Sequence, residues 1–334
     1  MPLVSIIVPC YNEQATISLL LDAVYKQTCP RPEIEVIIAD GLSTDHTREE
    51  IASYQRSHND LLIKVINNSK RNIPAGLNQA IAAATGQYII RLDGHAVPDP
   101  DYVERCVKLL ESKSGDNIGG VWDIKPGGPG KMAQAIAIAT AHPVGVGDAQ
   151  YRYTHKAQEV DTVPFGAFNR TLVERIGGFD EKLLTNEDYE FNVRIRQSGG
   201  KVWLDPSIRS IYYARATLGE LSHQYWRYGY WKAKMLRHYP ITIRWRQALP
   251  PAFIVSLLGL GIIAIWFPIN RYLLTIEIVV YLMVLFSVGL QSVLKKHDIT
   301  LFLLLPLAIV IMHFSWGLAF LWSLLDDSTA KTTG

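Results

Sequence analysis

The chain has 334 residues and a formal net charge of +2, and 49% of its residues are hydrophobic. This length accommodates one large domain with an appendage, and the charge gives no indication of a nucleic-acid partner. The three cysteines, Cys10, Cys29 and Cys106, are widely spaced. Their spacing argues against a disulfide framework and fits a reducing compartment.

Short apolar runs alternate with helix-like stretches in the first hundred residues. Each run is rich in β-branched residues and ends at turn-prone or acidic residues. This alternation predicts an α/β domain with a mainly parallel sheet covered on both faces. The predicted strands are 3–9, 35–40 and 88–93, and the predicted helices are 14–27, 44–58 and 75–86. Met1 leads almost directly into the first strand, so we expect no signal peptide.

Polar residues follow each of the three predicted strands: Glu13 after the first, Asp40 at the second and Asp93 at the third. Ligands of parallel sheets bind beyond the carboxyl ends of the strands, so three such ends together favour a binding site over three unrelated turns. The helix that follows Asp40 can present its N-terminus to an anion. Neither G-x-G-x-x-G nor G-x-x-x-x-G-K-[ST] occurs, which argues against a dinucleotide-binding fold and a P-loop NTPase.

The stretch "LLTNEDYEFNVRIRQSGG" at 183–200 predicts a helix that is entered at Thr185 or Asn186 and closed by two glycines. Glu187 and Asp188 then lie in its first turn, where the helix dipole favours the ionised carboxylate. A general base must be ionised before it accepts a proton. Taken alone, these acids are equally well explained as charge complementarity at a helix end.

From about residue 247 the composition changes, and three long apolar segments follow one another. Each is long enough to cross a bilayer, so we predict three transmembrane helices rather than buried core helices. They lie at about 248–269, 272–294 and 299–325, and Glu277 is the only acid among them. Basic residues cluster before the first span and between the second and the third, whereas the first connection has only Arg271, which predicts a multi-pass protein of the inner (plasma) membrane with a defined orientation. The large domain is then cytoplasmic and the tail 326–334 lies outside.

The segment 217–247 is rich in aromatic and basic residues, and Glu220 is its only acid. Such a mixture suits the membrane interface. Nucleic-acid binding would use the same mixture, but the apolar spans that follow argue against it. The predicted domains are therefore 1–216 as the catalytic domain, 217–247 as an interfacial segment and 248–325 as the membrane part.

Six motifs occur in a characteristic order over residues 3–230: "SIIVPCYNE", "IIADGLSTDHT", "GLNQAIAAATGQYIIRLDGHA", "GGFDE", "NEDYEFNVRI" and "HQYWRY". In this order they resemble the inverting family 2 glycosyltransferases, which have the GT-A fold. The Asp-Gly-His variant followed by three apolar segments is most similar to the succinoglycan-biosynthesis type of membrane glucosyltransferase.

The resemblance implies roles at the nucleotide-sugar end of the site. Pro9, Tyr11 and Glu13 belong to the loop that opens the nucleotide pocket, and Asp40 corresponds to the acid that holds the uracil or ribose. Arg71 is a candidate contact to the donor phosphates, although a solvated surface arginine is an equal alternative.

The same resemblance makes Asp93 the first acid of the D-x-D metal motif. If the backbone stays extended, Asp93 and His95 point to the same side of the strand. Asp93 then binds a divalent cation, and His95 either joins it or donates to a phosphate. Imidazole suits Mn²⁺ better than the harder Mg²⁺. The alternative is that His95 only caps the turn and Asp93 acts alone.

Beyond the cation, the resemblance implies that Asp188 is the catalytic base and that Glu187 is its neighbour, with a structural or acceptor-positioning role. Gly166 looks like part of the wall on the acceptor side, although an ordinary turn is an equal alternative. Gln224 and Arg227 match a Q-x-x-R-W element near the pyrophosphate, with Tyr228 in place of the tryptophan. That replacement puts the packing on the acceptor side in doubt.

The predicted function is transfer of a hexose, with glucose favoured, from a UDP-sugar to a polyprenyl-linked glycan in polysaccharide biosynthesis. A polyprenyl-phosphate sugar synthase is the alternative within enzymes, and an inactive nucleotide-binding scaffold is the alternative from another class. Three spans offer little material for the channel of a processive synthase. The large soluble domain argues against a transporter.

Overall fold

The computed structural model describes residues 2–326, with the side chain of Ile241 left out. The chain forms two compact units. The first consists of Met1–Asp123 and Gln150–Tyr212, and the second of Ile124–Ala149 and Tyr213–Gly334.

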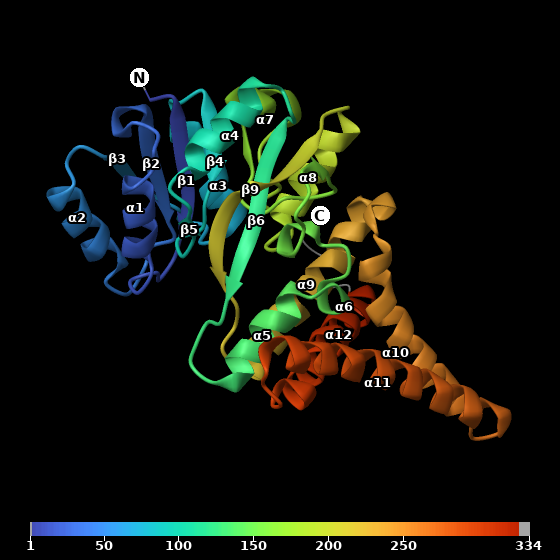
Figure 1. Cartoon of the computed structure of the whole chain (residues 1–334). Helices are drawn as coiled ribbons and strands as arrows, with labels where there is room; N and C mark the ends of the chain where they lie inside the picture. Colours follow the sequence, from blue (N-terminus) through green and yellow to red (C-terminus); the bar gives the residue numbers. More distant parts are fainter. Residues whose placement is uncertain (1, 327–334) are drawn as a thin grey trace. The chain divides into compact units, whose positions relative to one another are not determined.

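The first unit is built on a mixed sheet with the strand order β3-β2-β1-β4-β8-β6-β9-β5, and β7 pairs with β9 (Figure 1). The first four strands in this order are mutually parallel, and β8 then pairs antiparallel with both β4 and β6. The strands are β1 (Val4–Cys10), β2 (Ile34–Asp40), β3 (Leu62–Asn67), β4 (Tyr88–Arg91), β5 (Val97–Pro98), β6 (Asn117–Lys125), β7 (Gln158–Glu159), β8 (Ala167–Asn169) and β9 (Val202–Tyr213).

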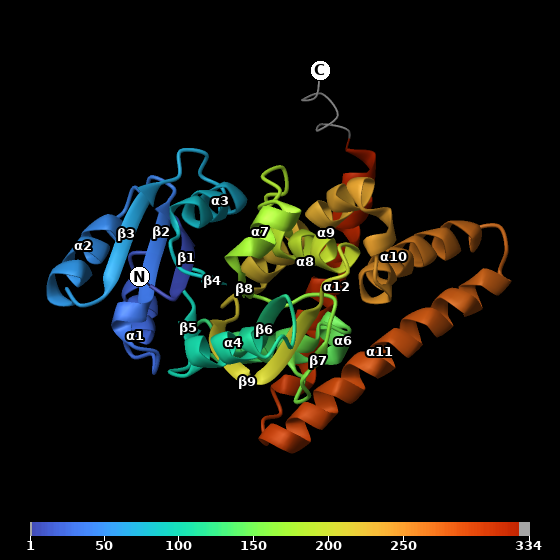
Figure 2. The ribbon, with the colours of Figure 1, turned by 90° about the horizontal axis from the view of Figure 1, so that it is seen from above.

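Helices cover both faces of this sheet, as the alternation of strands and helices predicts (Figure 2). One face packs against α1 (Ile17–Tyr25), α2 (Thr47–Ser57) and α4 (Tyr102–Glu111). The other packs against α3 (Ile73–Ala83), α7 (Arg170–Ile176) and α8 (Glu187–Gln197).

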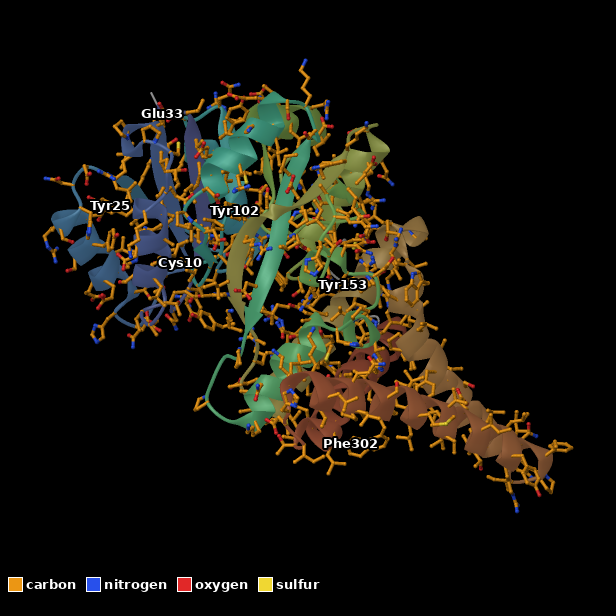
Figure 3. All side chains as sticks on the ribbon, viewed as in Figure 1. Cys10, Tyr25, Glu33, Tyr102, Tyr153 and Phe302 are labelled. Carbon is orange, nitrogen blue, oxygen red and sulfur yellow. The ribbon has the colours of Figure 1, made fainter. Side chains whose placement is uncertain are left out.

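The two-residue period of a strand decides which side chain enters which core. In β1, Val4, Ile6 and Val8 enter the first core, and Ile7 enters the second. Tyr102, labelled in Figure 3, lies inside the first core with 1% of its surface exposed and donates to the Phe165 carbonyl over 3.3 Å.

The predicted elements are all present, with shifted ends. α3 begins at Ile73 rather than at residue 75, because Asn72 accepts a hydrogen bond from Ala75 N over 2.9 Å and caps the helix. β4 ends at Arg91, two residues earlier than predicted. The residues after it therefore form a loop rather than the end of a strand.

The second unit is helical, with α12 (Leu301–Leu325) at its centre. α12 packs against α9 (Leu218–His238), α10 (Trp245–Ile263), α11 (Ile269–Lys296), α5 (Lys131–Ala141) and α6 (Pro143–Val146). α9 and α12 approach closely at Gly229, where a Cβ atom would lie 2.2 Å from the Trp316 carbonyl oxygen. In Figure 2, α10 and α11 form a long hairpin.

α10, α11 and α12 are long and apolar enough to cross a membrane, as predicted. Their exposed side chains are mostly large and apolar, which suits contact with lipid. Residues 124–149 differ from expectation: they belong to the second unit, since the apolar face of α5 packs on α12. The predicted tail lies outside the described residues beyond Asp326, and the predicted orientation stays a prediction.

Candidate active site

Two loops at the carboxyl edge of the sheet are tied together by hydrogen bonds. After β1, Asn12 N donates to Ser43 Oγ over 2.9 Å, and Asn12 Oδ1 accepts from Thr44 N over 2.8 Å. Glu13 N donates to Thr47 Oγ1 over 2.8 Å. These bonds hold the loop after β1, which contains Tyr11, against the loop that follows Asp40. Pro9 was predicted in this loop but lies within β1, where it is paired with Ala39 of β2. Tyr11 is left 48% exposed.

Asp40 is completely buried, and its carboxylate is engaged by the chain itself. Ser43 donates from both its backbone nitrogen and its hydroxyl, and Arg48 Nε lies 2.5 Å from Asp40 Oδ2. Asp40 therefore organises its own loop. Its contact with a uracil or ribose stays a prediction, and such a contact would require these partners to move.

The loop after β4 corrects the assumption of an extended backbone. Asp93 O accepts from Ala96 N over 2.9 Å, which closes a turn over Gly94 and His95. His95 Nδ1 lies 2.9 Å from Glu13 Oε1, while Asp93 Oδ1 lies 3.2 Å from Arg91 Nη2. A Cβ on Gly94 would lie 3.0 Å from Glu13 Cγ, so glycine leaves room for Glu13 beside the turn.

Arg91 connects the predicted cation ligand, Asp93, to the helix turn that contains the predicted base. It is the last residue of β4, its side chain is 7% exposed, and its Nη2 lies 2.9 Å from Glu187 Oε1. The same nitrogen contacts Asp93, so one buried guanidinium connects the turn after β4 to the first turn of α8. The predicted cation ligand and the predicted base are thereby held in one region of the first unit.

α8 begins as predicted, with Asn186 as its N-cap residue in a left-handed conformation at φ +70°. Asparagine tolerates this conformation better than most residues. Glu187 and Asp188 occupy the first turn. Asp188 is partly exposed, and its Oδ1 accepts from Tyr189 N over 2.7 Å, which fixes one of its two oxygens.

Burial sets the acid–base character of this pair. Desolvation raises the pKa of Glu187 to about 6, and the nearby Arg91 charge opposes that rise. Desolvation also raises the pKa of Asp188, again against the opposing effect of Arg91. A raised pKa makes Asp188 a stronger base than an exposed aspartate, as long as the carboxylate is ionised.

Gly166 lines the same cavity as Asp188, and a steric reason explains why this residue is a glycine. A Cβ on Gly166 would lie 2.2 Å from Asn117 Oδ1, so glycine makes room for a buried asparagine. Asn117 in turn donates to Asn192 Oδ1 over 2.6 Å. Gly166, Asn117, Asn192, Arg91 and Asp188 line one small cavity.

The remaining predicted residues lie elsewhere. Arg71 is exposed, at φ +54°, in the loop before α3. In the second unit, Gln224 Nε2 donates to the Tyr228 hydroxyl over 3.0 Å, so the tyrosine in place of tryptophan holds the glutamine on α9. Arg227 is an exposed residue of the same helix. The roles of Arg71, Gln224 and Arg227 stay predictions.

Arg91, Asn117 and Asn192 are candidate site residues that the sequence analysis missed. One signal was available for Arg91: a charged residue in an otherwise apolar strand, "YIIRLD", requires a buried partner of opposite charge. The two asparagines carry no such signal, since their pairing across 75 positions depends on the tertiary fold.

The donor set fits a divalent cation only in part. Within residues 2–326, no cluster of three or more His, Cys, Asp and Glu side chains is arranged to hold a metal ion by itself. Asp93 offers a carboxylate that is 25% exposed. His95, in the same turn after β4, contacts Glu13 in the loop after β1. This suits a hard cation whose other ligands are oxygen atoms of a bound diphosphate.

A mainly parallel sheet that continues into antiparallel strands, with acids grouped at its carboxyl edge, matches the GT-A fold of glycosyltransferases. The chain belongs to glycosyl transferase family 2, whose sequence profile matches residues 5–177.

Two relatives extend over nearly the whole chain. A dolichyl N-acetyl-α-D-glucosaminyl phosphate 3-β-D-2,3-diacetamido-2,3-dideoxy-β-D-glucuronosyltransferase of Methanococcus voltae is 27% identical, over 94% of each chain. The succinoglycan biosynthesis protein ExoA of Rhizobium meliloti is 28% identical, over 96% of this chain and 94% of its own.

A solved structure confirms the fold. The mannosyltransferase PcManGT from Pyrobaculum calidifontis, in complex with GDP-Man and Mn²⁺, has a TM-score of 0.66 at 20% identity. The similarity covers 98% of this chain and 88% of that one. S. aureus TarS with UDP-GlcNAc has a TM-score of 0.51 at 16% identity, over 97% and 92% of the two chains.

Proposed function

We propose that this enzyme transfers a hexose from a UDP-sugar to a lipid-linked glycan at a membrane, with inversion at the anomeric carbon. The observation that carries the proposal is the buried Arg91, which contacts both Asp93 and Glu187, the neighbour of Asp188. Through these contacts, Arg91 holds two groups close together in the first unit: Asp93, the proposed cation ligand on the leaving-group side, and Asp188, the proposed base on the acceptor side.

In the proposed reaction, the acceptor hydroxyl oxygen attacks the anomeric carbon while the bond from that carbon to the diphosphate oxygen breaks. Asp188 takes the hydroxyl proton, and the UDP leaves with the bonding electron pair. A single displacement converts an α-linked donor into a β-linked product. Positioning and electrostatic stabilisation of the developing charges provide the rate enhancement.

Asp93 would hold the divalent cation, Mn²⁺ or Mg²⁺, with Glu13 and His95 beside it. When bound, the cation neutralises charge that develops on the diphosphate. Glu13 accepts from His95 Nδ1 in the tautomer that carries its proton there, which orients the ring. The Mn²⁺ in the Pyrobaculum calidifontis mannosyltransferase structure supports a cation here.

Two findings support a lipid-linked acceptor. The Methanococcus relative bears the name of an enzyme that acts on a dolichyl-phosphate-linked sugar, and its product linkage is β. Three helices of this chain are long and apolar enough to cross a membrane. We propose that the first unit, which lies within residues 1–216, catalyses transfer, that 217–247 lie at the interface, and that 248–325 span the plasma membrane with the catalytic part in the cytoplasm.

The test is release of UDP by detergent-purified full-length protein, with a panel of UDP-sugars and GDP-mannose and with Mn²⁺, Mg²⁺ or EDTA. Glucose is the expected sugar. Three acceptors are compared: a polyprenyl-diphosphate-linked saccharide, bare polyprenyl phosphate and the lipid-free saccharide. The proposal requires cation-dependent turnover with the lipid-linked saccharide and a β-linked product by NMR.

The other outcomes overturn parts of it. Turnover on bare polyprenyl phosphate alone would make the protein a polyprenyl-phosphate sugar synthase. Equal turnover of the lipid-free saccharide would show that the enzyme does not recognise the lipid part of the acceptor. No turnover with any donor or acceptor would favour the inactive scaffold.

A further inference from the structure

A small cavity of the first unit lies against the Asp188 side chain. Its polar lining includes Arg91, Asn117 and Asp188, and Val163 and Phe179 contribute apolar walls. It leaves about 10 Å³ for the centre of a water-sized molecule. That is the smallest volume in which a protein holds one buried water.

Two buried polar atoms of the lining have no hydrogen-bond partner among the described residues. They are Arg91 Nη1 and Asn117 Oδ1. Both residues are otherwise satisfied: Arg91 Nη2 contacts two carboxylates, and Asn117 Nδ2 donates to Asn192. Arg91 is 6% exposed and Asn117 is 2% exposed. Burying such atoms without a partner is costly, so each implies a missing partner.

The two atoms are chemically complementary to a single water. Arg91 Nη1 can only donate, and Asn117 Oδ1 can only accept. One water accepts from the first and donates one hydrogen to the second, which leaves its other hydrogen for the Asp188 carboxylate. Three polar partners are the usual number for a buried water.

We propose that this cavity holds one ordered water, which bridges Arg91 Nη1 and Asn117 Oδ1 and donates to Asp188, and that it orients the base. The inference rests on the proposed role of Asp188. Tyr189 N holds Oδ1 of that carboxylate, and the water provides a second fixed contact. Asn117 is then a positioning residue that acts on the base through the water.

The direct test is a structure of the full-length protein in nanodiscs at a resolution that shows ordered waters. Density within hydrogen-bond distance of both Arg91 Nη1 and Asn117 Oδ1 is expected. A well-resolved cavity without such density overturns the proposal, and so does a rearrangement that joins the two side chains directly.

The functional test fills the cavity with Val163→Ile, which adds one methylene group beside the proposed water. We expect kcat to fall roughly tenfold, while the KM for the donor stays within about twofold. Val173→Ile is the matched control, because Val173 packs against the same core without lining the cavity. An unchanged kcat for Val163→Ile overturns the positioning role.

A double-mutant cycle separates water loss from simple overpacking. In an Asn117→Leu background the water has already lost an anchor, so Val163→Ile should lower kcat much less than in the wild type. Equal effects in both backgrounds would assign the loss to overpacking. Asp188→Asn distinguishes the two proposals: if that variant keeps full activity, the proposed base is wrong, whether or not the water is present.

Discussion

Removing the positive charge of Arg91 should destabilise the protein, and the loss should grow with pH. Arg91→Met keeps most of the side-chain volume but leaves the carboxylates of Asp93 and Glu187 without their cation. Loss of one partner of a buried ion pair costs about 3–5 kcal/mol. For a domain of this size each kcal/mol lowers Tm by roughly 2–4 °C, so we expect a decrease of about 10 °C at pH 8.

The sign of the pH dependence follows from Glu187. Its folded-state pKa is raised from 4.5 to about 6, so the folded state binds more protons than the unfolded state in that interval. Stability therefore falls as pH rises from 4.5 to 6, by about 2 kcal/mol, and is flat above. Without Arg91 the folded pKa rises further, so the variant should keep losing stability between pH 6 and 8.

The assay is thermal unfolding of the detergent-purified protein, followed by tryptophan fluorescence at pH 5.5, 6.5 and 8. Arg175→Met is the control: Arg175 pairs with Asp116 at 2.9 Å, but its side chain is 52% exposed, so the variant should lose less than about 1 kcal/mol. If the Arg91 variant matched the wild type at pH 8, or lost the same amount at every pH, the role given to this buried pair would be refuted.

Three further results are expected. Asp188→Asn should lower kcat by about 10²–10⁴-fold and leave UDP-sugar binding, measured by calorimetry, within about threefold; a small loss of kcat would exclude it as the base. Asp93→Ala should abolish Mn²⁺-stimulated UDP release. His95→Ala tests the role of the histidine: if this variant weakens Mn²⁺ binding about tenfold or more, His95 belongs to the cation site. An unchanged Mn²⁺ affinity makes His95 a residue of the turn only. Gly166→Ala should lower Tm by several degrees, because the new methyl group would collide with a buried asparagine; Gly219→Ala, with nothing within 4 Å of the added carbon, is the control and should change Tm little.

The local pattern of the sequence was enough to predict some elements of each unit, although most strands after β4 and most of the helices between them were not predicted. The apolar run of β1 enters both cores by simple alternation, and the stretch around Asp188 begins a helix where its capping residues indicate. The three apolar helices follow from length and apolar composition. These features depend on neighbours within a few residues, and a single sequence records such neighbours directly.

The sequence was less informative where a loop or a distant partner decides the geometry. Asp93 and His95 were expected on an extended strand, but a backbone bond from Ala96 N to Asp93 O makes a turn there. Asp40 ends its strand as predicted, but its carboxylate accepts a hydrogen bond from Ser43 and forms an ion pair with Arg48. Residues 124–149 joined the helical unit, since the partner of α5 is a helix far along the chain.

By itself, then, the sequence determined the class of the enzyme, the alternation of strands and helices in its first hundred residues and the three apolar helices, and it proposed the acids of the site, because each depends on residue type and short-range spacing. Only the tertiary structure decided that Arg91 connects Asp93 to the first turn of α8, and that Asn117 lies buried beside Gly166. A buried charge forms an ion pair with an opposite charge that the folded chain brings within about 3–4 Å. Folding sets this distance, and the separation of the two residues in the sequence does not.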